Sequence, residues 1–115
     1  MRYITALTIA GSDSCGGAGI QADIKTMTAL GVYAASVITS VTSQNTKGVY
    51  GVESIRKDAV ESQLDAVFQD MVVDAVKIGM LGGADVMKTV AASIEKYKPE
   101  NIVLDPVMVS TSGHA

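Results

Sequence analysis

Apolar residues in this sequence fall into two patterns, short unbroken runs and positions at helical spacing. The runs are uncharged or nearly so and rich in β-branched residues, as is typical of buried strands. They cover Tyr3–Ala10, Val32–Val41, Ala75–Ile78 and Asn101–Leu104. Between them, apolar residues recur every three or four positions, which indicates amphipathic helices. The chain is therefore expected to alternate between strands and helices.

Three helices are expected between the strands. The first runs from about residue 20 to Gly31, the second covers Lys57–Met71, and the third lies around Met87–Tyr97 before Pro99. Strands that alternate with helices are joined by crossover connections and run parallel. The pattern predicts an open α/β sheet, and in such sheets ligands bind at the carboxyl ends of the strands.

Four segments follow the predicted strands and carry the unusual residues: Gly11–Gly19, Thr42–Tyr50, Gly79–Gly83 and Asp105–Ala115. The second of these is polar and rich in turn-forming residues, and we expect it to be a loop. The sequence stops in the segment after the fourth strand, where a buried parallel strand expects further neighbours and covering helices. We therefore expect the chain to be part of a longer protein.

The glycine-rich segment fits neither of two familiar nucleotide-binding motifs. Gly11 and Gly16 have the spacing of a P-loop, but Gly17 and Ala18 stand where the lysine and the hydroxyl residue belong. From Gly17 the sequence also matches G-x-G-x-x-A. That dinucleotide motif needs an acid near the end of the second strand, and Val32–Asn45 contains none. What remains is a loop that lets the backbone approach a ligand closely.

Composition narrows the function classes. The net charge of −3, with Arg56-Lys57 as the only adjacent basic pair, argues against nucleic-acid binding, which needs clustered positive charge. A single cysteine, Cys15, excludes an internal disulfide and fits a reducing compartment. No signal-peptide pattern and no membrane-spanning run are present, so a cytoplasmic location is expected. Cys15 has no histidine nearby in sequence, and we assign it no role.

Several polar residues near the predicted strand ends have two possible roles. Asp23 can favour the dipole of its helix or contact a ligand. Ser12 and Asp13 are more typical of turns and caps than of catalysis. The amide of Gln44 can donate and accept hydrogen bonds together, either to a ligand or to nearby backbone. Met80 can fill the core or face a ligand.

Four segments, in the same order, resemble the hydroxymethylpyrimidine/phosphomethylpyrimidine kinases of thiamine synthesis, in the ribokinase-like superfamily. They are Ala6–Thr26, Val41–Thr46, Lys77–Leu81 and Val103–Gly113. The resemblance implies a three-layer α/β/α fold with a mainly parallel sheet. Residues 1–115 would be the N-terminal part of one such kinase domain. It also implies phosphorylation of 4-amino-5-hydroxymethyl-2-methylpyrimidine and its monophosphate, with ATP and Mg²⁺.

The same resemblance implies a set of site residues. Those expected to line the pyrimidine pocket are Gly11, Ala18, Asp23, Thr42, Gln44, Met80 and Val107. The Thr42 position carries valine in some relatives, and its hydroxyl can also bond to nearby backbone. Asp105 is expected near Mg²⁺ and the phosphates, or else caps the turn that follows it. His114 stands where the family often has an aspartate, and it receives no role.

The catalytic base and the glycine-rich anion hole of the family belong to its C-terminal half, which is absent from this sequence. The 115-residue chain alone is therefore expected to bind the small pyrimidine but not to catalyse the reaction. Full-length relatives are typically homodimers, and no membrane or nucleic-acid partner is expected. Two alternatives remain. One is a pyridoxal kinase, which Gln44 within VTSQNT disfavours, and the other is a non-catalytic pyrimidine-binding protein.

Overall fold

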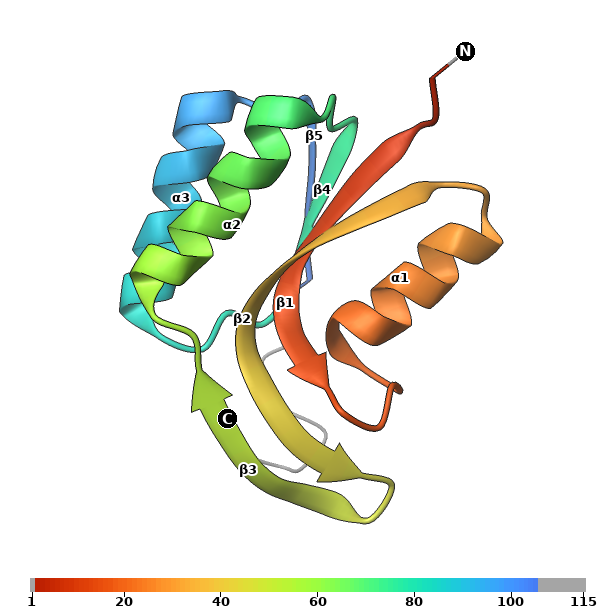
Figure 1. Cartoon of the computed structure of the whole chain (residues 1–115), viewed down its shortest axis with the longest axis vertical. Helices are drawn as coiled ribbons and strands as arrows, with labels where there is room; N and C mark the ends of the chain where they lie inside the picture. Colours follow the sequence, from red (N-terminus) through yellow and green to blue (C-terminus); the bar gives the residue numbers. More distant parts are fainter. Residues whose placement is uncertain (1, 106–115) are drawn as a thin grey trace.

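A computed structural model describes residues 2–105, which form one five-stranded sheet flanked by helices on both faces (Figure 1). The elements, in chain order, are β1 (Thr5–Asp13), α1 (Gly19–Ala29), β2 (Tyr33–Asn45), β3 (Gly48–Ser54), α2 (Lys57–Asp70), β4 (Ala75–Ile78), α3 (Ala84–Tyr97) and β5 (Asn101–Leu104). The strand order is β3-β2-β1-β4-β5. Pairing is parallel between β2, β1, β4 and β5, while β3 runs antiparallel to β2. The predicted three-layer α/β/α fold is confirmed.

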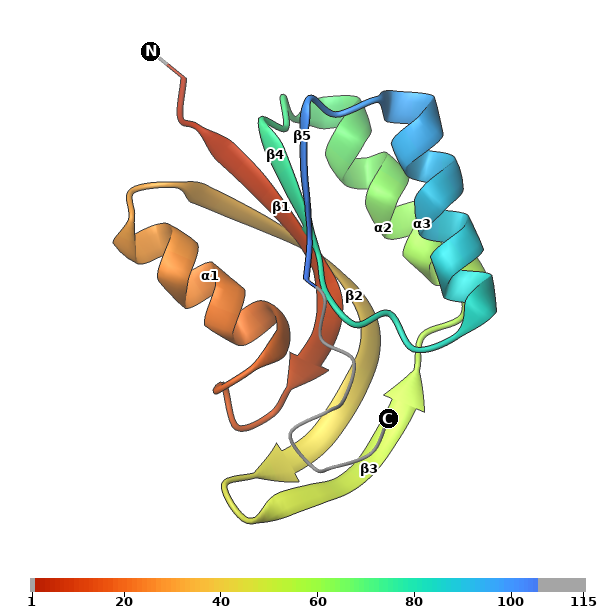
Figure 2. The same ribbon diagram turned by 180° about the vertical axis from the view of Figure 1, so that it is seen from behind.

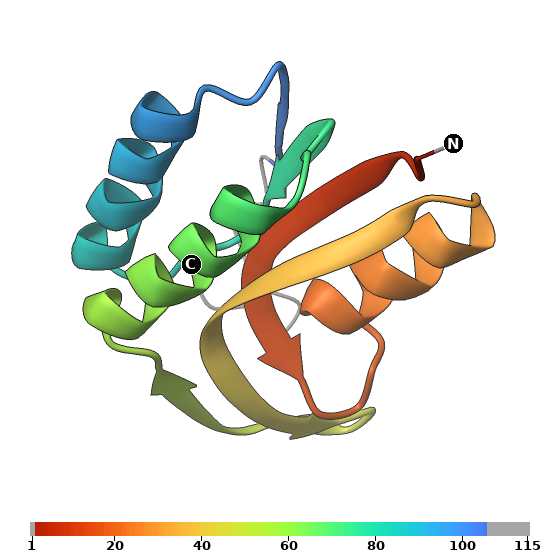
Figure 3. The same cartoon turned by 45° about the horizontal axis from the view of Figure 1, so that its top comes forward.

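The two faces of the sheet are packed differently because the side chains of a strand alternate in direction. On β1, Leu7 and Ile9 are fully buried in a cluster with residues of α2 and α3, among them Leu64 and Val90. The intervening positions of β1 are small, and α1 packs there (Figure 2). Helices α2 and α3 lie side by side over the opposite face (Figure 3). The main core thus lies beneath α2 and α3.

The apolar patterns located most elements closely. Ala75–Ile78 and Asn101–Leu104 are strands with the predicted bounds, and the second helix ends at Asp70, one residue before the expected Met71. The first strand is shifted, because β1 begins at Thr5 and continues to Asp13. The first three residues of the segment expected as a glycine-rich loop are therefore part of the sheet.

The prediction of a loop at Thr42–Tyr50 was wrong. Strand β2 continues to Asn45, and the chain returns through a tight turn as β3, which pairs with β2 from Ser40 to Asn45. Much of this hairpin is exposed, since six of the seven residues of β3 are exposed. Burial on one face is what produces apolar alternation, and the outer part of the hairpin lacks it.

The connections place a crevice at one edge of the sheet. After β1 the chain passes through α1 to β2, whereas after β4 it passes through α3 to β5, on the other side. Connections that diverge from two neighbouring parallel strands leave a crevice at their carboxyl ends, where open α/β sheets bind ligands. Within residues 2–105 the helices have at most 14 residues, and none is long and apolar enough to cross a membrane.

Candidate functional site

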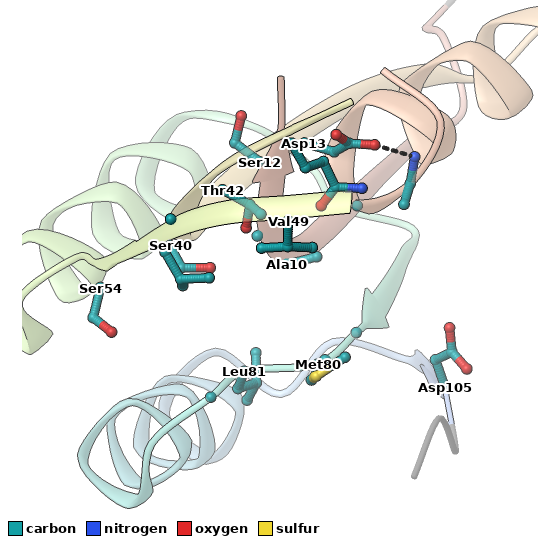
Figure 4. A pocket seen from close by; sticks show the side chains of 18 of the residues that line it. Ala10, Ser12, Asp13, Ser40, Thr42, Val49, Ser54, Met80, Leu81 and Asp105 are labelled. Carbon is teal, nitrogen blue, oxygen red and sulfur yellow. Dashed lines mark hydrogen bonds between the residues drawn. The ribbon is translucent and has the colours of Figure 1, made fainter. Parts of the chain in front are cut away.

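A cavity of about 770 Å³ opens at the carboxyl ends of β1 and β4 (Figure 4). Its walls come from the end of β1, the start of α1, the β2–β3 hairpin, the segment after β4 and the residue after β5. This volume lies within the range of small-molecule sites. The cavity therefore occupies the place that the strand topology predicts for a ligand.

The glycine-rich loop is organised around the carboxylate of Asp13, a residue only 4% exposed. Its two oxygens accept hydrogen bonds from the backbone N–H groups of Cys15 (2.8 Å), Gly17 (3.0 Å) and Ala18 (2.9 Å). Figure 4 shows one of these bonds at Asp13. The N–H groups that a phosphate-binding loop would offer to a phosphate are thus bonded to the protein's own anion. This arrangement agrees with the rejection of a P-loop from the sequence.

Two glycines bring β1 close to the start of α1. Gly19 has a φ of +58°, and a Cβ there would lie 2.2 Å from the carbonyl oxygen of Gly11. A Cβ on Gly11 would in turn lie 2.6 Å from Oγ of Ser40 on β2. Neither position accommodates a side chain without a shift of backbone or of a packed neighbour. The cavity wall at Gly11 is therefore bare backbone.

Gln44 is held at the cavity by its backbone. The hydroxyl of Ser14 accepts a hydrogen bond from the Gln44 N–H (2.9 Å) and donates one to the Gln44 carbonyl oxygen (2.7 Å). The β2–β3 register shifts between Ser43 and Gln44, and such bulges re-aim side chains. Within residues 2–105 the Gln44 side-chain amide makes no hydrogen bond, although it lines the cavity. Among the described residues, the amide thus lacks the local backbone partner that was the alternative to a ligand contact.

A chain of polar contacts connects α1 to the cavity wall. Asp23 accepts a hydrogen bond from Oγ1 of Thr8 at one oxygen (2.6 Å) and from Nζ of Lys77 at the other (2.6 Å). Nζ of Lys77 also lies 3.7 Å from an oxygen of Asp105, directly after β5. Lys77 and Asp105 line the cavity, but Asp23 does not. The cavity thus has an ion-paired wall that is supported from α1.

The structure brings most of the expected site residues together. Five of the seven predicted pocket residues line the cavity: Gly11, Ala18, Thr42, Gln44 and Met80. Asp23 lies behind the wall on Lys77, and Val107 lies outside the described residues, as does His114. Asp105, the expected metal-side residue, is at the rim with its side chain 33% exposed.

Several lining residues were missed from the sequence. The β3 residues Val49, Tyr50 and Val52 were missed because the hairpin itself was not recognised. Lys77 was missed although it left a signal, since a lysine in the short buried strand Ala75–Ile78 requires a partner. The role of Asp13 also had a weak signal, because aspartates commonly accept hydrogen bonds from N–H groups a few residues ahead.

Magnesium is compatible with the residues at this rim. Within residues 2–105 no three His, Cys, Asp or Glu side chains group as metal ligands. Asp105 by itself suits Mg²⁺, because this ion usually takes one or two carboxylates and completes its shell with water and nucleotide phosphates. Cys15 is exposed in the loop, and its backbone N–H donates a hydrogen bond to Asp13.

Comparison with known proteins identifies the family of this chain. The family model for phosphomethylpyrimidine kinase matches residues 13–115. The hydroxymethylpyrimidine/phosphomethylpyrimidine kinase of Escherichia coli (strain K12) is 53% identical over 113 residues, or 98% of this chain and 42% of that protein. The chain thus spans less than half the length of this relative.

Solved structures agree with the sequence comparison. The crystal structure of phosphomethylpyrimidine kinase from Clostridium difficile 630 superposes with a TM-score of 0.92 and 52% identity, covering 96% of this chain and 48% of that one. An ADP complex of Bacillus subtilis pyridoxal kinase superposes with a TM-score of 0.87 and 40% identity, covering 94% and 41%. Since the family model spans most of the chain and the cavity lies where the strand topology places it, the chain belongs to the phosphomethylpyrimidine kinase family.

Proposed function

We propose that the protein carrying this chain transfers phosphate from ATP to 4-amino-5-hydroxymethyl-2-methylpyrimidine, called the pyrimidine alcohol below, and then to its monophosphate. The observation that carries this proposal is Gln44, which lines the cavity while Ser14 fixes its backbone and no residue within 2–105 bonds to its side-chain amide. An aminated ring presents both donors and acceptors, and an amide can match one of each. The name of the E. coli relative supports the same reaction.

The chain's own residues bind and orient the acceptor. Met80 and Leu81 after β4, with Val49 from β3, provide apolar contact for a flat ring. Gln44 would fix the rotation of the ring through directed hydrogen bonds. Asp105 would help to hold Mg²⁺, which neutralises charge on the phosphates during transfer. Positioning of this kind accounts for much of the catalysis of phosphoryl transfer.

The donor side of the reaction is proposed to lie outside residues 1–115. These residues would be the N-terminal part of a single ribokinase-like domain, and the catalytic base and anion hole would be supplied by further sequence. The glycine-rich loop supports a donor site elsewhere, because its N–H groups bond to the Asp13 carboxylate and are not free to hold ATP phosphates. We also propose a cytoplasmic homodimer, whose mass can be measured by light scattering.

The proposal is tested by Gln44→Ala in the protein as encoded, with Ser43→Ala as a matched control that does not line the cavity. We expect Gln44→Ala to weaken binding of the pyrimidine alcohol by about 1–3 kcal/mol, because polar atoms of the ring lose their partner. Binding is measured by titration calorimetry, and KM by a coupled ADP assay. An unchanged affinity would remove Gln44 from the site.

Pyridoxal phosphorylation is the second candidate function, favoured by the 40% identity to B. subtilis pyridoxal kinase. Both substrates carry a hydroxymethyl group on a heteroaromatic ring, so the same cavity could present either alcohol. The two candidate functions are distinguished by measuring kcat/KM for the pyrimidine alcohol and for pyridoxal, each with ATP as the phosphate donor. We expect the ratio to favour the pyrimidine, and a ratio that favours pyridoxal would replace the first candidate. Binding without any phosphoryl transfer would indicate a pyrimidine-binding protein.

A further inference from the structure

The carboxylate of Asp23 is bonded to the protein itself and lies behind the cavity wall. Both carboxylate oxygens are occupied, one by the Thr8 hydroxyl and the other by the Lys77 ammonium, each at 2.6 Å. Its side chain is only 13% exposed, and it does not line the cavity. A ligand in the cavity meets Lys77 rather than Asp23, because Lys77 lines the cavity and Asp23 bonds to Lys77 from behind it.

Lys77 does reach the cavity, with hydrogen-bonding capacity left over. An ammonium has three N–H donors, and within residues 2–105 one of them is used in the hydrogen bond to Asp23. The neighbouring Asp105 oxygen, at 3.7 Å, is beyond hydrogen-bond length. Among the described residues that line the cavity, Lys77 is the only lysine or arginine. Its side chain is 29% exposed, so part of it remains open to a ligand.

We propose that Lys77 is the ligand contact of this pair, and that Asp23 is a positioning residue that acts through it. The group that Lys77 would bind is a phosphate oxygen of the phosphorylated pyrimidine, since a charged donor held in a partly dry site favours an anionic acceptor. Thr8 on β1 and Asp23 on α1 would hold the ammonium in place before the ligand arrives. This inference rests on the proposed function and deepens it.

The electrostatic surroundings set the expected specificity. Asp23 and Asp105 both face Lys77, so the wall as a whole is not strongly positive. A neutral ring therefore gains little from it, whereas a phosphate can accept the remaining N–H groups directly. Removal of the ammonium should harm the monophosphate more than the pyrimidine alcohol.

The experiment measures dissociation constants of both pyrimidines by calorimetry, on the protein as encoded and without nucleotide or Mg²⁺. The variants are Lys77→Met, Lys77→Arg, Asp23→Asn and the double variant Lys77→Met/Asp23→Asn. Lys88→Met, on the exposed side of α3, controls for the change of net charge. The double variant removes both charges together and leaves no unpaired Asp23 carboxylate. It therefore tests the loss of the Lys77 ammonium even if Lys77→Met alone fails to fold.

We expect Lys77→Met to weaken monophosphate binding at least about tenfold, the effect of losing a charge-assisted hydrogen bond. The pyrimidine alcohol should change less than about threefold, and Lys77→Arg should recover part of the loss. Asp23→Asn should show the same selective pattern, and the double variant should be no worse than Lys77→Met, because one residue acts through the other.

Three results would overturn the inference. The first is an equal loss for both pyrimidines on Asp23→Asn that adds to the effect of Lys77→Met, since Asp23 would then contact the ring itself. The second is unchanged monophosphate affinity in Lys77→Met, which would remove Lys77 from the phosphate contact. The third is binding of neither pyrimidine by the unmodified protein, which would end the proposed function and this inference together.

Discussion

The two ends of the sheet each contain an aspartate that accepts backbone hydrogen bonds, and they use it differently. At the amino end, Asp74 precedes β4, accepts the N–H of Thr5 and pairs with the Arg2 guanidinium at 2.8 and 3.0 Å. At the carboxyl end, Asp13 is 4% exposed, and its carboxylate accepts hydrogen bonds from backbone N–H groups of the loop. The first joins two strands in contact with water, whereas the second determines the shape of a cavity wall.

The difference shows where an anion can shape a site. A guanidinium pair in solvent gains little, because water and salt screen it and two flexible side chains must be ordered. A buried carboxylate surrounded by N–H groups fixes the path of the backbone instead. We therefore expect the amino end to tolerate changes that the carboxyl end does not, although both ends share one core.

The largest loss of stability is expected from a substitution in that shared core, and it should affect both ends of the sheet equally. Leu64→Ala removes a fully buried side chain of α2 from the cluster that also contains Leu7 and Val76. We expect a loss of about 2–5 kcal/mol in the free energy of unfolding, from lost burial and the cavity left behind. Urea denaturation measures it. A loss well below 1 kcal/mol would mean that this cluster is not the main core.

A smaller effect is expected from Asp13→Ala, and it should be local. Three N–H groups lose their acceptor, and we expect a cost of about 1–3 kcal/mol, moderated because water can reach this loop. Hydrogen exchange should accelerate at Cys15, Gly17 and Ala18 but not at Thr5. Asp13→Asn keeps one oxygen acceptor, so its stability should lie between that of the unmodified protein and that of Asp13→Ala. Equal acceleration at both ends would show that Asp13 supports the whole fold.

The smallest effect is expected at Asp74, and it depends on pH. Hydrogen bonds from the Arg2 guanidinium, and then from the Thr5 N–H, lower the pKa of the Asp74 carboxyl group. Its contribution to stability is therefore present above the unfolded pKa of about 3.9 and is lost as the pH falls through the lower folded value.

Comparison of the unmodified protein with Asp74→Asn tests this pH dependence. The stability difference measured by thermal denaturation should be small at pH 7 and should shrink as the pH falls below about 4. A difference that grows on acidification would contradict the sign of the pKa shift. High salt should also reduce it, because exposed ion pairs are screened.

The sequence predicted the buried strands better than the exposed hairpin beside the cavity. The difference in burial explains why. Ala75–Ile78 and Asn101–Leu104 were located by their apolar runs, because burial leaves a pattern along the chain. The outer part of the β2–β3 hairpin leaves no such pattern, since much of it faces solvent. Its remaining signals were the turn-forming Gly48 and the β-branched and aromatic residues Val49, Tyr50 and Val52.

Site residues were predicted by resemblance, but their contacts were not. Gln44 and Met80 both line the cavity, and their contact with a pyrimidine stays a prediction. Asp23 was expected beside the ring, and its position on Lys77 could not be read from the chain, because the two residues are 54 positions apart and meet only through sheet topology. Pairings of this kind depend on the order of strands, which local pattern does not determine.

The close approach of Gly19 to Gly11 has a consequence for how this gene can vary. Every missense change in a glycine codon adds a Cβ, and at Gly19 that atom would enter the carbonyl of Gly11. Cys15, four positions earlier, points into solvent and meets no such barrier. In a saturation library across this loop, we therefore expect no functional substitutions at Gly19 and many at Cys15.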